Sequence, residues 1–321
     1  MNALPLLNGL SLEVRSARGR EDRMADVYNA IEEGRYEAAI ALIQGGADVG
    51  WASETFRWTA LHLAAIRAHP RLVSLLVQHR ARVEAEDGWK RTPLLRAIGW
   101  MSSLSKEEAR LECVKLLLQA GANIRHCDKD GNNALHYATS RRQLSIAQHL
   151  LTVDPSLCLV KNSAEETALH VAADYTQPAM ISLLLQHGAR VDDQDNQKQT
   201  PLLVAIGCPR PWDIGWRSSP SKEEDRLRCV EVLLQAGANI RHCDENGNNA
   251  LHYACQSSHL SIVKHLIIAD LSLLQVKNKK GKMPSNYAKD DIKAHIQKVE
   301  ALLKSVNPVL DASIDEDLHF L

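Results

Sequence analysis

The chain of 321 residues lacks long apolar runs, a charge excess and an abundance of phenylalanine, and the first two absences exclude whole classes of protein. Its net charge is −1, so bulk electrostatics favour neither nucleic acid nor an anionic membrane surface as a partner. No apolar stretch approaches the ~18–20 residues that a membrane-spanning helix needs. The first seven residues lack the basic stretch and small-residue cleavage site of a signal peptide. We therefore expect no membrane span and no leader.

Motifs that carry catalysis or metal binding are also missing. The seven cysteines are an odd number without Cys-x-x-Cys spacing, which indicates reduced thiols in a cytoplasmic compartment. No glycine-rich phosphate loop, Gly-x-Ser-x-Gly or His-Glu-x-x-His motif occurs. The sequence thus predicts no cofactor, no metal and no catalytic residues.

What the chain does contain is a six-residue motif, called the phrase below, that occurs six times. It begins as Thr59-Ala60-Leu61-His62-Leu63-Ala64, and the intervals between successive starts are 33, 41, 34, 33 and 49 residues. A period near 33 is typical of a solenoid, in which each unit contacts only its neighbours. The phrase resembles the Thr-Pro-Leu-His-x-Ala signature of the ankyrin repeat. The later copies start at Thr92, Asn133, Thr167, Thr200 and Asn249.

The second half of each unit supports this resemblance. Gly121 and Gly237 stand where a helix needs a residue that tolerates positive φ at its end. Pro70 and Pro178 fall where a second helix begins, a position that proline tolerates. The resemblance implies an all-α ankyrin-repeat solenoid of about eight helix pairs with β-turn fingers.

The expected domain organisation follows from where the repeats lie. We expect an N-terminal extension over residues 1–21, the repeat domain over 22–305 with capping units at both ends, and an acidic tail over 306–321. Inside the repeat domain, the three-unit block 59–166 is duplicated as 167–282, and residues 117–138 and 233–254 differ at two positions only. The duplication predicts two related surfaces, although a duplication without a second binding site remains an alternative.

Insertions lengthen the second and fifth units. Each contains a Ser-Lys-Glu-Glu capping box, at residues 105–108 and 221–224, which predicts a second helix that starts near Lys106 or Lys222. We expect that helix to be extended by about two turns. The remaining inserted residues form loops, and insertions in repeat proteins are often used for binding.

The candidate binding residues are the tryptophans and the variable finger positions. All six tryptophans fall outside the predicted helices, and tryptophan is enriched at interface hot spots; the alternative is that some of them cover loops of the solenoid itself. The resemblance to ankyrin proteins implies a protein partner held by the fingers and inner helices. Lys90 and Lys198 replace the usual finger glycine, so we expect those two turns to be shaped differently. The candidates are Trp51, Trp58, Glu86, Trp89, Arg91, Trp100, Cys127, Lys129, Asp130, Asn132, Gln194, Asn196, Gln197, Gln199, Trp212, Trp216, Cys243, Glu245, Asn246 and Asn248.

Several histidines and cysteines could be metal ligands or catalytic residues, but they are better explained as structural. In the ankyrin family, the histidine at the fourth position of the phrase makes structural hydrogen bonds. The pairs His126-Cys127 and His242-Cys243 each offer only two ligands, without others at zinc-site spacing. We therefore predict a monomeric, non-enzymatic module that binds a protein. The tail resembles the C-terminal signals of bacterial effectors, which is one possible setting. The alternative is an enzyme with its site in an insertion or cleft, at Cys208 or the His-Cys pairs.

Overall fold

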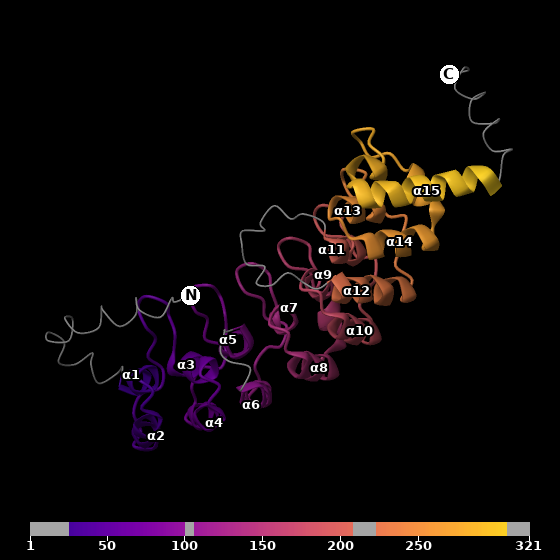
Figure 1. Ribbon diagram of the computed structural model, residues 1–321. Coiled ribbons are helices and arrows are strands. Elements are labelled where there is room, and N and C mark those ends of the chain that lie inside the picture. Colours follow the sequence, from indigo (N-terminus) through magenta and orange to yellow (C-terminus); the bar gives the residue numbers. More distant parts are fainter. Residues whose placement is uncertain (1–25, 100–105, 208–222, 307–321) are drawn as a thin grey trace. The chain divides into compact units, whose positions relative to one another are not determined.

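The computed structural model describes residues 26–99, 106–207 and 223–306 (Figure 1). The chain divides into two compact units, residues 1–157 and 158–321, which are considered separately. Within the described residues every regular element is a helix, apart from an isolated antiparallel bridge between Ala52 and Thr59. The predicted all-α class is confirmed.

The first unit contains four helix pairs, stacked first helix on first helix and second helix on second helix. Their alanine- and leucine-rich inner surfaces are fully buried, as at Leu61, Leu94 and Leu135, and neighbouring pairs share this core. The first helices are α1 (Asp26–Glu32), α3 (Ala60–Ile66), α5 (Pro93–Gly99) and α7 (Ala134–Ser140). The second helices are α2 (Tyr36–Gln44), α4 (Pro70–Gln78), α6 (Glu107–Gln119) and α8 (Leu144–Val153).

The second unit repeats this arrangement and ends in an atypical pair. A 3₁₀ helix, η4 (Pro284–Tyr287), replaces the first helix of the last repeat and packs on α13, while the long α15 (Asp290–Val306) packs on α14. The described residues therefore contain the eight expected pairs. The other first helices are α9 (Ala168–Asp174), α11 (Pro201–Ile206) and α13 (Ala250–Gln256), and the other second helices are α10 (Pro178–Gln186), α12 (Glu223–Gln235) and α14 (Leu260–Ala269).

Two short 3₁₀ helices were not expected from the sequence. They are η2 (Pro155–Leu159) after α8 and η3 (Leu271–Gln275) after α14. An aspartate starts each of them: Oδ1 of Asp154 accepts the Ser156 amide at 3.1 Å, and Oδ1 of Asp270 accepts the Ser272 amide at 3.0 Å.

No helix among the described residues is both long enough and apolar enough to cross a membrane.

The histidine of the repeated phrase connects each helix start to the following finger. Nδ1 of His62 accepts the backbone N–H of Thr59 at 3.1 Å, so the ring proton is on Nε2, which donates to the Arg91 carbonyl at 3.0 Å. His170 and His252 make the equivalent pairs of contacts. The buried ring of His62 thus satisfies the hydrogen-bonding needs of the Thr59 amide and the Arg91 carbonyl, which lie 32 residues apart in sequence.

Burial gives these histidines a pH dependence. It lowers the pKa of His62 and of His136 to about 4, because the charged imidazolium loses its hydration. In the unfolded chain a histidine titrates near ~6.5. Their contribution to stability is therefore complete above that value and is lost as the pH falls towards 4.

We expect acid to destabilise the first unit through these two rings. Between pH 6.5 and 4, each histidine should lower the free energy of unfolding by roughly 1.4 kcal/mol per pH unit, measured by urea denaturation at a series of pH values. The double variant His62→Leu/His136→Leu should flatten this slope, since Leu95 and Leu203 already occupy the equivalent position in the second and fifth units. An unchanged slope in the double variant would contradict the assignment.

The fingers share one hydrogen-bonded turn. In the second, third, fifth and sixth fingers, Oδ1 of an aspartate accepts the backbone N–H groups two and four residues later, at 2.8–3.0 Å. Lys90 and Lys198 adopt φ of 57° and 58°, close to the 78° and 77° of Gly131 and Gly247. The expectation of differently shaped turns at the lysines is therefore wrong. The two amide bonds to the aspartate offset the cost of about 1–2 kcal/mol that a left-handed lysine carries.

The insertion-bearing units have a longer second helix, but by less than expected. Helices α6 and α12 contain 13 residues each, against 9 in α4 and α10. The extension is thus about one turn rather than two. Helix α6 starts at Glu107, and the side chain of the preceding Lys106 makes no capping bond. The serines of the two capping boxes, Ser105 and Ser221, lie outside the described residues.

The added turn carries a buried arginine. Nη1 of Arg110 donates to the Ala97 carbonyl at 2.6 Å, and Nη1 of Arg226 donates to the Ala205 carbonyl at the same distance. These carbonyls end α5 and α11, where a helix leaves its last acceptors unsatisfied. The extra turn therefore connects the two helices of the repeat.

Candidate protein-binding face

We define the finger face as the fingers together with the first helices beside them. In the first unit this face carries an aromatic cluster of Phe56, Trp58 and Trp89. Phe56 stacks on Trp58 with ring centroids 5.0 Å apart and on Trp89 at 5.8 Å. The guanidinium of Arg96, from α5, lies 5.0 Å from the Trp58 ring and 5.3 Å from the Trp89 ring. The cluster thus joins two fingers and a helix through stacking and cation–π contacts.

A buried ion pair lies under the cluster. Nε of Arg96 is 2.6 Å from Oδ2 of Asp87, the aspartate of the second finger, and both residues are less than 5% exposed. Burial lowers the pKa of Arg96, and the Asp87 carboxylate opposes that shift. One carboxylate thus uses one oxygen to shape the finger and the other to hold the guanidinium.

The neighbouring finger repeats this use of a carboxylate. The Tyr137 hydroxyl donates to Oδ2 of Asp128, and Nε of Arg91 lies 3.5 Å from the same oxygen. The Arg91 guanidinium also lies 5.5 Å from the centre of the Tyr137 ring. Burial and the hydrogen bond to Asp128 both raise the pKa of Tyr137, so its hydroxyl keeps its proton.

The tryptophans predicted to bind differ in what they contact. Trp89 is 39% exposed, but its ring also packs on Phe56 and Arg96, so it has more intramolecular packing than a fingertip position suggested. Trp51 packs edge-on against Tyr28 of α1 at 4.9 Å and covers that helix. The three tryptophans of the insertions, Trp100, Trp212 and Trp216, lie outside the described residues.

Removing the buried arginine should be costly. Arg96→Met leaves the Asp87 carboxylate buried without its counter-ion, and we expect a loss of roughly 3 kcal/mol in the free energy of unfolding. The matched control is Arg71→Met, whose exposed pair with Glu37 at 3.3 Å should be worth less than about 1 kcal/mol. Asp87→Asn combined with Arg96→Met should restore much of the loss, because Asn278 shapes the last finger with the same two amide bonds. Equal losses in the two single variants would refute the role of the pair.

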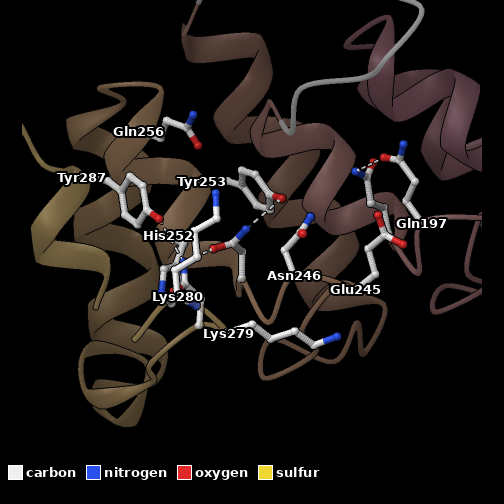
Figure 2. Close-up of a pocket in the computed structure, with 12 residues that line it drawn as sticks. Gln197, Glu245, Asn246, His252, Tyr253, Gln256, Lys279, Lys280 and Tyr287 are labelled. Carbon is white, nitrogen blue, oxygen red and sulfur yellow. Dashed lines mark hydrogen bonds between the residues drawn. The ribbon is translucent and has the colours of Figure 1, made fainter. Parts of the chain in front are cut away.

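In the second unit the equivalent face is a polar groove (Figure 2). The groove has a volume of about 490 Å³ and is lined by the fifth, sixth and seventh fingers and by α13 and η4. Gln197 and Glu245 lie at one end of the view and Lys280 and Tyr287 at the other, with Tyr253 between them. The structure thus brings together five of the predicted site residues, namely Gln197, Gln199, Glu245, Asn246 and Asn248.

Amide side chains organise the wall of the groove. Nε2 of Gln199 donates to Oε1 of Gln197 at 2.7 Å, and Nδ2 of Asn278 donates to Oδ1 of Asn248 at 2.8 Å and to the Tyr287 hydroxyl at 3.0 Å. Gln199 is 2% exposed, and within the described part of the chain its Oε1 has no hydrogen-bond partner. A buried acceptor without a donor is costly unless something supplies one.

In each His-Cys pair, the histidine ring contacts the preceding finger rather than its neighbouring cysteine. Nε2 of His126 lies 2.7 Å from the Lys90 carbonyl, and Nε2 of His242 lies 2.7 Å from the Lys198 carbonyl, so each ring contacts the preceding finger. Burial, together with the adjacent aspartate, raises the pKa of both Cys127 and Cys243, which is opposite to what a nucleophilic thiol requires. Among the residues that the structure describes, no group of three possible ligands could hold a metal ion. Cys208 lies outside them.

The remaining predicted residues lie along the fingers. Lys129, Asp130, Gln194 and Asn196 are exposed, and Asn132 is half-buried at the base of the third finger. The Glu86 carboxylate lies 3.8 Å from His126 Nε2. The finger-face residues that sequence reasoning missed are Phe56, Arg96, Tyr137, Tyr253, Lys279, Lys280 and Tyr287. Of these, Tyr137 and Tyr253 had a recognisable signal, because each directly follows the histidine of its phrase.

Comparison with known proteins defines the class. A model described as "Ankyrin repeats (3 copies)" matches residues 27–106 and 152–211, and one described as "Ankyrin repeats (many copies)" matches 101–151 and 221–267. The chain belongs to the ankyrin repeat family.

Particular relatives agree with this class. The B-cell lymphoma 3 protein homolog of Mus musculus is 30% identical over 65% of this chain and 43% of its own length. Ankyrin repeat and SOCS box protein 6 of Mus musculus is 37% identical over 49% of this chain and 34% of its own length. Inversin of Homo sapiens is 29% identical over 72% of this chain and 20% of its own length. The chain thus spans less than half of each of these curated relatives.

A solved structure confirms the fold. The ankyrin repeat domain of Bcl-3, described as a unique member of the IkappaB protein family, aligns with a TM-score of 0.57 at 24% identity. The alignment covers 74% of this chain and 97% of that domain. The predicted ankyrin-repeat architecture is therefore confirmed.

Proposed function

We propose that this chain is a non-enzymatic binding module that captures a protein partner on its finger face. The main support comes from the duplicated segments 117–138 and 233–254, which are identical except at two positions. Both differences, Lys129 against Glu245 and Asp130 against Asn246, fall on exposed fingertips. The two substitutions thus change fingertip side chains that face solvent and leave the buried residues as they are, which is compatible with one scaffold used for two contacts.

The two blocks, 59–166 and 167–282, would then contribute two related surfaces of different chemistry. The first offers Trp89 of the aromatic cluster with Arg91 and Lys129 beside it, and the second offers the polar groove. Aromatic residues and arginine are the types that most often anchor protein interfaces. The insertions, with Trp100, Trp212 and Trp216, are proposed as added contacts.

Two further observations bear on the setting in which the module works. The six cysteines within the described residues are free thiols, which supports a reducing, cytoplasmic location. Because the thiols on the fingers have raised pKa values, the geometry supports binding rather than catalysis. We propose that the module acts as a monomer.

Affinity capture followed by mass spectrometry tests the finger face. The variant Trp89→Ala should lose captured proteins, because truncation of an interface anchor commonly costs about 2 kcal/mol or more of binding free energy. Since Trp89 also packs on Phe56 and Arg96, a second variant is needed that has no packing to lose. Lys129→Glu, at an exposed fingertip, serves that purpose and should alter the captured set with unchanged helical circular dichroism.

The matched control is Val153→Ala, at the end of α8, where the side chain is 53% exposed. It should capture the same proteins as the original chain. A captured set that is unchanged in both finger variants, or lost equally in Val153→Ala, would rule out the finger face as the site.

A further inference from the structure

The two copies of the finger face differ most in their cations. Arg91, Arg96 and Lys129 of the first copy correspond to Gln199, Val204 and Glu245 of the second. The backbone that carries them is the same: the Lys129 amide donates to the Trp89 carbonyl at 3.0 Å, and the Glu245 amide donates to the Gln197 carbonyl at 3.1 Å. At these three positions the second copy therefore loses three positive charges and gains one negative charge, while Lys279 and Lys280 of its last finger stand where the first copy has Ser163 and Ala164.

The loss leaves the carboxylate of the fifth finger without the arginine that its counterpart in the second finger has. Asp195 occupies the position of Asp87, is 6% exposed, and its Oδ1 accepts the amides of Gln197 and Gln199. Where Asp87 meets the guanidinium of Arg96, Asp195 has a valine, Val204, at the equivalent position. Burial raises the pKa of Asp195 and the negative charge of Glu245 adds to that shift, whereas the amide bonds from Gln199 and Gln197 and the positive charge of Lys161 oppose it.

One acceptor on the groove wall, Gln199 Oε1, also lacks a donor within the described residues. In the first copy, the Arg91 guanidinium lies beside the Asp128 carboxylate and over the Tyr137 ring. In the second copy, the shorter Gln199 takes the position of Arg91. Its buried Oε1 has no hydrogen-bond partner within the described residues. Both Gln199 and Tyr253 line the groove.

We propose that this groove binds an arginine side chain of a protein partner. The incoming guanidinium takes the place that Arg91 fills in the first copy. It donates to Gln199 Oε1 and to the Glu245 carboxylate, lies against the Tyr253 ring, and is attracted by the buried charge of Asp195. Lys279 and Lys280 also line the groove, and in Figure 2 the Lys279 side chain extends towards the side on which Glu245 lies.

Arginine fits this site better than lysine does. The guanidinium presents five N–H donors in a planar fork and is more weakly hydrated than an ammonium group. It can therefore satisfy the amide oxygen and the carboxylate together and still stack on the tyrosine. This inference rests on the proposed function, and it names the partner chemistry that the second surface selects.

Peptide titration of the full chain tests the proposal. The probes are acetyl-Gly-Arg-Gly-amide and its lysine counterpart, and the readout is the NMR shift of the side-chain amide of Gln197, which lines the groove and is present in every variant. We expect a dissociation constant near ~1 mM for the arginine peptide, as a single side chain would give, and binding at least about fivefold weaker for the lysine peptide.

Two variants convert the groove towards the chemistry of the first copy. Gln199→Arg supplies an internal guanidinium, and Glu245→Lys reproduces Lys129. Each variant should weaken binding of the arginine peptide about tenfold. Both new residues already occur at the equivalent positions of the first copy, so the backbone tolerates them. The matched control, Lys129→Glu, should leave binding at Gln199 unchanged.

The outcomes separate this inference from the proposed function. Unchanged peptide affinity in both groove variants, or equal affinity for the lysine peptide, overturns the arginine assignment. If the peptide fails to bind while Gln199→Arg still abolishes capture of a protein, the finger face stands as a binding surface and the arginine assignment is refuted.

Discussion

The buried finger aspartate is the contact on which the rest of the described structure depends. One carboxylate oxygen accepts two backbone amides and closes the turn, so that each finger keeps its shape whatever its tip residues are. The ring of the phrase histidine then bonds to a carbonyl of that finger from the helix of the preceding repeat. Because these bonds use only backbone groups and two side chains, the exposed positions between them are free to vary in charge and size.

The second oxygen of each aspartate determines what chemistry a finger can offer. In the second finger it holds Arg96, in the third it holds the Tyr137 hydroxyl, and in the sixth it holds the Tyr253 hydroxyl. A carboxylate that is neutralised internally supports a surface of aromatic and basic side chains. In the fifth finger, Asp195 has Val204 where Asp87 has Arg96, so it holds no arginine from the helix that follows. The same scaffold thus presents different side chains on its fingers through a few substitutions.

The sequence predicted the helix pairs well, because the repeated phrase contains the contacts that start each first helix. Thr59 and His62 lie three residues apart, and their mutual hydrogen bonds are local. The left-handed lysines were misjudged, since residue preference alone opposes that conformation and the stabilising amide bonds come from an aspartate three residues earlier. The extra helical turn was overestimated, because inserted sequence length does not show where Arg110 must stand to reach Ala97.

The candidate site was predictable in its positions but not in its contacts. The fingertip alignment placed Gln197, Gln199 and Glu245 on one face, and the structure puts them in one groove. The aromatic cluster, in contrast, depends on Phe56, Trp58 and Trp89 meeting across two fingers, which no local pattern encodes. The cation between the rings comes from a third element, α5, and only the packed structure reveals that Arg96 is buried there.

The arginines that connect the two helices of the lengthened repeats have a consequence for how such a protein can evolve. Arg110 and Arg226 fasten the start of the second helix to the end of the first, so the ends of each insertion are held by the repeat itself. The two insertion-bearing intervals differ by eight residues, 41 against 49, while the arginine bond keeps the same length. Since even doubling the length of a flexible loop costs only about 0.6 kcal/mol, the inserted segment is a place where new sequence can be tried without disturbing the stack.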